Sequence, residues 1–242
     1  MRTILIAVFL LLSFISNAHL VDSLNTAKNC VYMTKIEREM IYEINLVRST
    51  PKVYIMILDS MLKIANEELK EYGKGYRNYS LTIGTSEKDG KTVKTIDTTW
   101  HYVNEEKVKA ISTLIDDLKK MGHLSILKPD EGIYRAATKH VNDQKTHNWE
   151  LMHTGSDGSQ PWDRILKFSP SMSFGNENIA GNSAEIVTAR DIVIQLLVDS
   201  GIPGYGHRYN LLNPAWTHAA CKHDLYKGMH WWVQNFGVKK KS

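Results

Sequence analysis

The chain has 242 residues, of which 43% are hydrophobic and 23% are charged, which is ordinary usage for a globular protein. A formal net charge of +4 is too small to indicate a nucleic-acid partner. The length suffices for one large domain or two small ones, and two cysteines are too few for a small disulfide-dependent scaffold.

The first 18 residues have the layout of a secretory signal peptide. Arg2 precedes an apolar run from Ile4 to Leu12, and the small residues Ser16 and Ala18 occupy the −3 and −1 positions of a cleavage site. This run is shorter than the roughly 20 residues that a membrane-spanning helix needs, so export is favoured over a membrane anchor. No later segment is long and apolar enough to cross a bilayer. We therefore expect a secreted, extracellular protein without a transmembrane segment.

The two cysteines, Cys30 and Cys221, are far apart in the sequence. In an oxidising compartment such a pair predicts one disulfide between the start of the domain and a late strand. The alternative is two unpaired, buried thiols.

The first half of the chain is predicted to be mainly helical. Apolar residues at helical spacing indicate a helix from Ile36 to Val47 that ends before Pro51, and a second helix over about residues 53–69. Residues 76–102 are rich in Tyr, Thr and Val and contain an Asp-Gly turn, so we expect a polar excursion or a small hairpin. We interpret residues 74–103 as an insertion.

Two further helices are expected before the polar motifs begin. An apolar stripe from Val108 to Met121 predicts the first, and a narrow stripe of small residues predicts the second over about 132–146. His140 borders the second stripe, where a hydrogen-bonded core histidine is favoured over a ligand. Asp163 and Arg164 are expected to form a structural ion pair or a helix start.

Residues 174–180 are predicted to form a short strand. Period-two alternation places Glu177 on the same face as Ile179, the more apolar face. A carboxylate in that position is costly unless another group pairs with it.

The helix after this strand is expected to begin at Asn182, an N-cap with Glu185 three residues later. Its buried stripe starts at Ile186 and continues to Asp199. An acid at a helix C-terminus opposes the helix dipole, so Asp199 indicates a cationic or metal partner, or else a simple turn-forming residue.

The last part of the chain combines a shaped loop with a hairpin. The loop over residues 201–214 contains three glycines, all of them before His207. Apolar and polar residues alternate over 215–224 and 229–236, which predicts two strands joined by a Lys-Gly turn. Aromatic residues on both faces of the second strand indicate helices packed on both sides.

Two histidines and two carboxylates on separate elements suit a divalent transition metal such as zinc. The same groups would also serve general acid–base chemistry on a bound water. Spacing alone does not show that His153, Glu177, Asp199 and His207 converge.

Three ordered motifs resemble the CAP superfamily of cysteine-rich secretory proteins, antigen 5 and pathogenesis-related proteins. These are His-Thr-Gly-Ser-Asp-Gly from His153, Asn-Glu-Asn-Ile-Ala from Asn176, and Gly-His-Arg-Tyr-Asn-Leu-Leu-Asn-Pro from Gly206. The last motif is closest to the bacterial and lower-eukaryotic form. The resemblance implies an α+β fold, a three-layer α-β-α sandwich with a small central antiparallel sheet and an open cleft. It spans residues 35–237, apart from the insertion.

The resemblance also implies a cleft tetrad of His153, Glu177, Asp199 and His207, in which the two histidines bind zinc or another divalent metal. Asp199 departs from the family pattern, because Glu is common there. The family's extra disulfides and cysteine-rich tail are missing, so ion-channel blocking is not expected.

Three functions are weighed from these observations. The first is a secreted binding module with a sterol, lipid or extracellular protein ligand, more binding protein than enzyme. The second is a metal-assisted hydrolase in which Glu177 would be the catalytic general base. The third is a structural or adhesive domain whose tetrad is only a buried polar network.

The predicted organisation is a signal peptide over 1–18, an N-terminal segment over 19–34, the CAP domain over 35–237 and a basic tail over 238–242. The tail contains three consecutive lysines, most simply a solvated end of the chain.

Overall fold

The computed structural model describes residues 22–73, 77–88, 91–147 and 152–241. The predicted signal peptide lies outside this range. Within it, none of the helices combines the length and the apolar character that a bilayer crossing requires.

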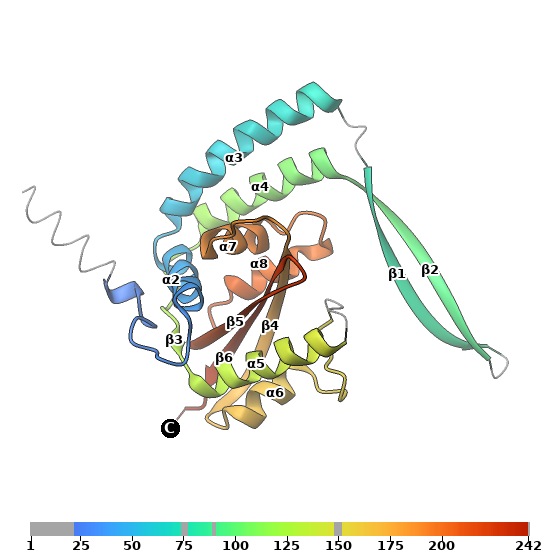
Figure 1. The fold of residues 1–242 in the computed structure, drawn as a ribbon. Helices are drawn as coiled ribbons and strands as arrows, with labels where there is room; N and C mark the ends of the chain where they lie inside the picture. Colours follow the sequence, from blue (N-terminus) through green and yellow to red (C-terminus); the bar gives the residue numbers. More distant parts are fainter. Residues whose placement is uncertain (1–21, 74–76, 89–90, 148–151, 242) are drawn as a thin grey trace, which may run out of the picture.

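Seven α-helices, one short 3-10 turn and six strands have both ends within the described part of the chain (Figure 1). The helices are α2 (Lys35–Ser49), α3 (Pro51–Tyr72), α4 (Val103–Lys120), α5 (Glu131–Thr146), α6 (Pro161–Phe168), α7 (Ala189–Val198) and α8 (Gly206–Leu211), and the turn is η2 (Pro203–Tyr205). The strands are β1 (Arg77–Lys88), β2 (Lys91–Tyr102), β3 (Lys128–Pro129), β4 (Met172–Asn182), β5 (His218–Tyr226) and β6 (Met229–Lys239).

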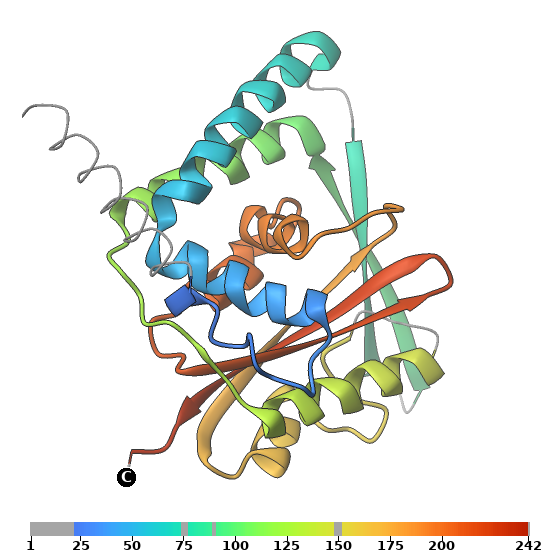
Figure 2. The same ribbon diagram turned by 60° about the vertical axis from the view of Figure 1, so that its left-hand side comes forward.

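A four-stranded sheet in the order β3-β5-β6-β4 forms the middle layer. Helices α2, α7 and α8 cover one face and α5 and α6 cover the other, as Figures 1 and 2 show from two directions. This confirms the α+β, three-layer α-β-α prediction. The strand pairs β4–β6 and β5–β6 are antiparallel, whereas the two-residue β3 joins β5 in parallel. Strand β4 is therefore an edge of the sheet.

Strand β6 supplies aromatic bulk to both layers, as its alternating pattern predicts. Trp232 and Phe236 belong to the large core beneath α2 and α7. Trp231 and Val233 pack with Val141 in a smaller cluster beneath α5. The sheet is thus covered by apolar contacts on both faces.

The segment before α2 packs into the same domain. Leu24 and Ala27 are buried. Asn45 of α2 donates to the Leu24 carbonyl at 3.0 Å and accepts from the Leu127 amide at 2.7 Å. Residues 22–34 therefore belong to the folded body.

The insertion forms the predicted hairpin. Strands β1 and β2 pair along twelve residues each, from Arg77 opposite Tyr102 to Lys88 opposite Lys91. The hairpin leaves the body at the ends of α3 and α4 and projects beside it (Figure 1).

The prediction that Asn182 caps the next helix is wrong. Asn182 ends β4 and accepts from the Ala184 amide at 2.9 Å. The helix begins seven residues later, where Thr188 and Asp191 exchange amide hydrogen bonds at 2.9 and 3.2 Å. Ile186, expected to be buried, is 82% exposed because it precedes the helix.

The structure does not form the predicted disulfide, since Cys30 and Cys221 are both free thiols. Cys221 is completely buried on β5, and its thiol donates to the Glu37 carbonyl at 3.3 Å. Burial raises the pKa of Cys221, which keeps the thiol protonated. The Cys221 side chain is thereby directed at α2, and Cys30 lies in the turn before that helix.

Glu37 joins three elements through its buried carboxylate. It accepts from the Thr34 amide at 2.7 Å, from Lys222 at 2.9 Å, from the His223 amide at 3.0 Å and from the Tyr134 hydroxyl at 3.3 Å. Burial alone would raise the pKa of Glu37, but the bonds from His223, Lys222 and Thr34 outweigh it and lower the pKa. The ionised form therefore stabilises the contact of α2 with β5 and α5.

We expect Glu37→Gln to lower the free energy of unfolding at pH 7 by about 1–3 kcal/mol, because it leaves several charge-assisted donors poorly satisfied. The folded pKa lies below the unfolded value of 4.5, so this stabilisation is complete above 4.5 and declines as the pH falls below it. Urea unfolding of both proteins on the two sides of this pH measures the difference. A difference that does not shrink in acid would contradict the assignment.

Candidate functional site

The loop that carries His153 is held from two helices. Asp143 of α5 accepts from the Ser156 amide at 2.8 Å and also from the Ser156 hydroxyl. Arg164 of α6 donates to the His153 carbonyl at 2.8 Å and to the Ser159 carbonyl at 2.6 Å. The backbone around His153 is therefore fixed, although its side chain is 47% exposed.

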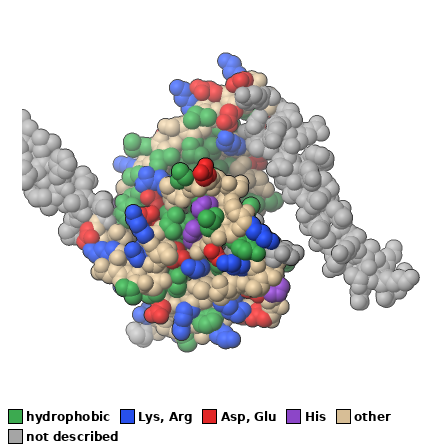
Figure 3. Space-filling model, in the orientation of Figure 1, with side chains coloured by type: hydrophobic (Ala, Val, Ile, Leu, Met, Phe, Trp, Pro, Cys, Tyr) green, Lys and Arg blue, Asp and Glu red, His purple; other side chains and the backbone are tan. Residues whose placement is uncertain are grey.

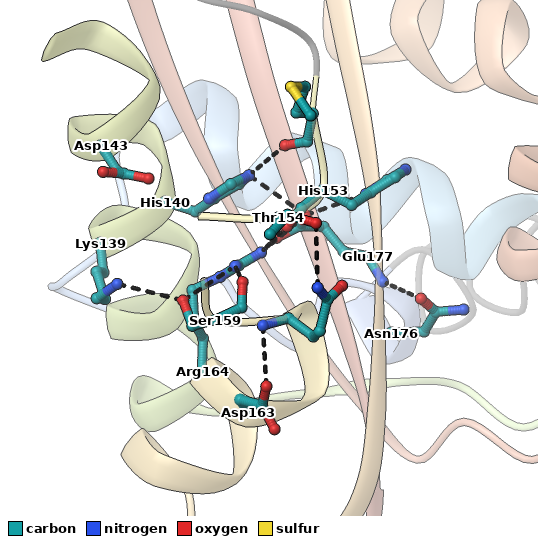
Figure 4. Close-up of polar contacts among 12 residues, drawn as sticks. Lys139, His140, Asp143, His153, Thr154, Ser159, Asp163, Arg164, Asn176 and Glu177 are labelled. Atoms are coloured by element: carbon teal, nitrogen blue, oxygen red, sulfur yellow. Dashed lines mark hydrogen bonds and ion pairs between the residues drawn. The ribbon is translucent and has the colours of Figure 1, made fainter. Parts of the chain in front are cut away.

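Glu177 of β4 is the buried centre of this half of the site (Figure 4). Its carboxylate is fully buried and accepts from Arg164 at 3.0 and 3.1 Å and from His153 Nδ1 at 3.2 Å. In the amide orientation that satisfies both its ends, Asn235 donates to Glu177 at 3.0 Å. The sequence predicts that a buried Glu177 needs a pairing group, and Arg164 is the main one.

His140 is a hydrogen-bonded core histidine, as favoured from the sequence. Its Nε2 lies 2.9 Å from the Met152 carbonyl and 3.6 Å from Glu177 Oε1. Burial lowers the pKa of His140, which keeps the ring neutral. Nε2 must then carry the proton to donate to the carbonyl. His140 thereby holds the backbone of Met152, the residue directly before His153.

His207 and Asp199 form the other half of the site. Asp199 ends α7 in the left-handed conformation, with φ of 53°. Its carboxylate accepts from His207 Nδ1 at 2.7 Å and from the His207 amide at 2.9 Å. The shorter acid therefore reaches its histidine, and these two donors offset its unfavourable position at a helix C-terminus.

Glu106 and Arg208 hold the segment that runs from the end of α7 to the start of α8. Glu106 of α4 accepts from the Ser200 hydroxyl, from the Gly201 amide at 2.9 Å and from the Tyr205 hydroxyl at 3.2 Å. Arg208, which is buried, donates to the Leu197 carbonyl of α7 at 2.8 Å. These contacts fix the start of α8, where His207 lies.

Consecutive residues of β4 connect the two halves. Glu177 binds the His153 side chain, and Asn178 donates to the His207 carbonyl at 3.2 Å. Adjacent residues of a strand point to opposite faces, so the halves are held from the two sides of the edge strand.

The four predicted residues therefore form two histidine–carboxylate pairs. Within the described ranges, no group of three or more His, Cys, Asp and Glu side chains is arranged to hold a metal ion.

A pocket of about 500 Å³ lies beside the second pair. Its wall is mostly apolar and includes Asp199 and His207, with no contribution from His153 or Glu177. The lining comes from α3, α4, β4, α7 and the following loop; its apolar members are Met61, Ile111, Ile179, Ala180, Ile194, Leu196, Val198 and Ile202. In the orientation of Figure 3, hydrophobic side chains gather in the region between the α3–α4 pair and the rest of the body.

His153 and His207 each direct their Nδ1 atom at a carboxylate. A carboxylate on Nδ1 requires that nitrogen to carry the proton, which leaves Nε2 as the unprotonated atom. Such an outer carboxylate commonly orients a metal-binding histidine. The pairs are therefore chemically competent to present two Nε2 ligands.

The chain is thus a three-layer α-β-α domain with two histidine–acid pairs at one edge of its sheet. The model of the CAP family, described as the cysteine-rich secretory protein family, matches residues 70–236. Since this is more than half of the chain, the protein belongs to the CAP family.

Two solved structures that match part of the chain come from bacteria. An outer surface protein of Borrelia burgdorferi is 22% identical, with a TM-score of 0.42, over 56% of this chain and 95% of its own. An extracellular protein of Bacillus anthracis that contains an SCP domain is 21% identical, with a TM-score of 0.38, over 60% of this chain and 47% of its own. No curated protein sequence matches the chain.

Sequence reasoning missed the counter-ion of Glu177 and the anchor of the His207 loop. Asp163 does start α6, where it accepts from the Gln160 amide at 2.9 Å, but Arg164 pairs with Glu177 and not with its neighbour. Glu106 lies about ninety residues before the loop that it holds. Arg164 and Glu177 lie on consecutive elements, thirteen residues apart, but neither they nor Glu106 carry a local pattern that signals the partner.

We expect Arg164→Met to destabilise the protein by about 3–5 kcal/mol, because it leaves the Glu177 carboxylate buried without its cation. Adding Glu177→Gln to this variant should recover part of the loss, because the remaining side chain is neutral. Chemical denaturation of the two single variants and the double variant measures the coupling. Strictly additive losses would show that the pair does not interact.

Proposed function

We propose that this chain is an exported CAP-domain binding protein that takes an apolar ligand of the sterol or lipid class in the pocket beside His207. The N-terminal apolar run followed by a small-residue cleavage site supports export. Membership of the cysteine-rich secretory protein family agrees with it.

The observation that carries the ligand class is the lining of the pocket. A volume of about 500 Å³ lies within the range of small-molecule sites, which are mostly apolar with a few polar groups that orient the ligand. Here the polar groups include the His207–Asp199 pair and Lys107, with Gln195 and Ser200 also in the wall. A ligand with an apolar body and one polar end would match both the apolar and the polar residues of this wall.

We expect Ile202→Asp to weaken binding of a fluorescent sterol or of a fluorescent fatty acid at least about tenfold. The variant loses an apolar contact worth about 1.5–3 kcal/mol when fully buried and adds a charge to the wall. Ile202 is 44% exposed, so the fold should tolerate the change. Fluorescence titration of both probes measures the affinity and separates the two ligand classes.

The matched control is Ile186→Asp, which places the same charge at an isoleucine that is 82% exposed and is not part of the pocket wall. The control should bind like the wild type. Failure of both probes to bind the wild type, or equal binding by both variants, would count against the proposal.

A divalent metal at His153 and His207 remains a prediction. The two Nε2 atoms would be its protein ligands, and Glu177 and Asp199 would orient the rings. Bound there, an ion would polarise a ligand oxygen or a water. The donors fit zinc chemically, and the arrangement in two pairs means that two protein ligands would have to suffice.

Protein purified from zinc-supplemented medium should contain about one zinc per chain, and His153→Ala should lose most of it, since removing even an outer-shell partner costs about 10–100-fold in affinity. Elemental analysis by mass spectrometry measures the content. His147→Ala removes an exposed histidine at the end of α5 and serves as the control. Metal-free wild type, or an unchanged His153→Ala, would refute the metal site.

The geometry gives the hydrolase alternative little support. A general base has to reach the proton that it removes, directly or through one water. The Glu177 carboxylate is fully buried, and Arg164 and His153 already occupy its oxygens. Its contacts favour a role in holding His153.

A further inference from the structure

A further pair of histidines lies outside the site of His153 and His207, near the turn of the β5–β6 hairpin. His223 of β5 and His230 of β6 face the same side of the sheet, with His223 opposite Trp232 and Leu225 opposite His230 in the register. His223 Nε2 and His230 Nδ1 are 2.9 Å apart, and the ring planes differ by 17°. Both side chains are partly exposed.

The backbone that carries these two rings is fixed by the surrounding structure. The His223 amide donates to the buried Glu37 carboxylate at 3.0 Å. The His223 ring packs on Trp232, with centroids 4.3 Å apart. Both strands are paired up to the turn, so the two nitrogens are presented by a rigid ladder.

From this arrangement we propose that His223 and His230 form a binding site for a divalent transition metal of the copper or nickel type. Two nitrogen ligands at right angles, each about 2.0–2.1 Å from an ion, lie roughly 2.9 Å apart, which is the spacing of His223 Nε2 and His230 Nδ1. The ring centroids are 5.1 Å apart, so the two nitrogens point at one another, and both rings turn about their side-chain torsions to face a common ion. Square-planar or tetragonal nitrogen sites suit Cu²⁺ and Ni²⁺, and Cu²⁺ binds most tightly of the divalent series.

Metal binding requires no net loss of a proton from a neutral pair. In the histidine–histidine hydrogen bond one facing nitrogen carries a proton and the other accepts it. The donating ring moves that proton to its other nitrogen, and both facing nitrogens then hold lone pairs for the ion. Water or an external ligand completes the coordination, because the site supplies two protein donors.

This site is independent of the proposed ligand pocket and of His153 and His207. The test therefore uses the full-length chain with His153→Ala and His207→Ala as the background, titrated with Cu²⁺ alone. We expect one Cu²⁺ per chain, with nitrogen hyperfine structure in the electron paramagnetic resonance spectrum. Quenching of tryptophan fluorescence should accompany it, because Trp232 lies against His223.

In that background, His230→Gln should weaken Cu²⁺ binding at least about tenfold, since loss of a ligand costs no less than loss of an outer-shell partner. His147→Gln should leave it unchanged. Thermal unfolding without metal checks that each variant is folded, and His223→Gln gives a second reading from the opposite strand. Binding that survives both changes, or a background protein that binds no Cu²⁺, would overturn the proposal.

Discussion

The edge strand β4 is the constraint on which the candidate site depends. Two consecutive residues of this strand, Glu177 and Asn178, project to opposite faces of the sheet. Glu177 holds the His153 side chain, and Asn178 holds the His207 backbone. His153 lies on a loop on one side of the sheet, and His207 lies on the short helix α8 on the other side. The two halves are therefore registered to one another through the backbone of a single strand. A shift of β4 by one residue would exchange the faces of Glu177 and Asn178 and separate both histidines from their partners.

Burial of the Glu177 carboxylate explains why Arg164 is placed beneath the site. An isolated ionised carboxylate inside a protein costs several kcal/mol, and a paired one becomes tolerable only when its remaining lone pairs are satisfied. Arg164 supplies the charge, and its other bonds run to the His153 and Ser159 carbonyls. Neutralising Glu177 and fixing the His153 loop are thus done by one side chain. Asp199 needs no such cation, because the His207 ring and amide both donate to it.

The sequence predicted the elements well where the signal was local. Periodicity identified α2 to α5, the body of α7, the β4 strand and the β5–β6 hairpin, but not the short helices α6 and α8. It also placed Glu177 and Asp199 in buried positions, where each is less than 5% exposed. Capping was less certain: Asn182 with Glu185 and Thr188 with Asp191 are both plausible starts, and only the end of β4 at Asn182 decides between them. The partner of Arg164 depends on how α6 packs against β4, and the free thiol of Cys221 depends on its contact with α2; no local pattern encodes either contact.

The division of the site into two pairs also bears on what it does. The first pair combines an exposed histidine with a carboxylate that is sealed by Arg164, so its reactive face is the imidazole alone. The second pair opens onto a mostly apolar pocket. A catalyst needs a free base and a nucleophile next to a bound substrate, whereas a binding site needs apolar surface and a few fixed donors. In this protein both carboxylates are used to hold histidines, and the apolar surface is what remains available to a ligand. That arrangement supports the proposed binding function.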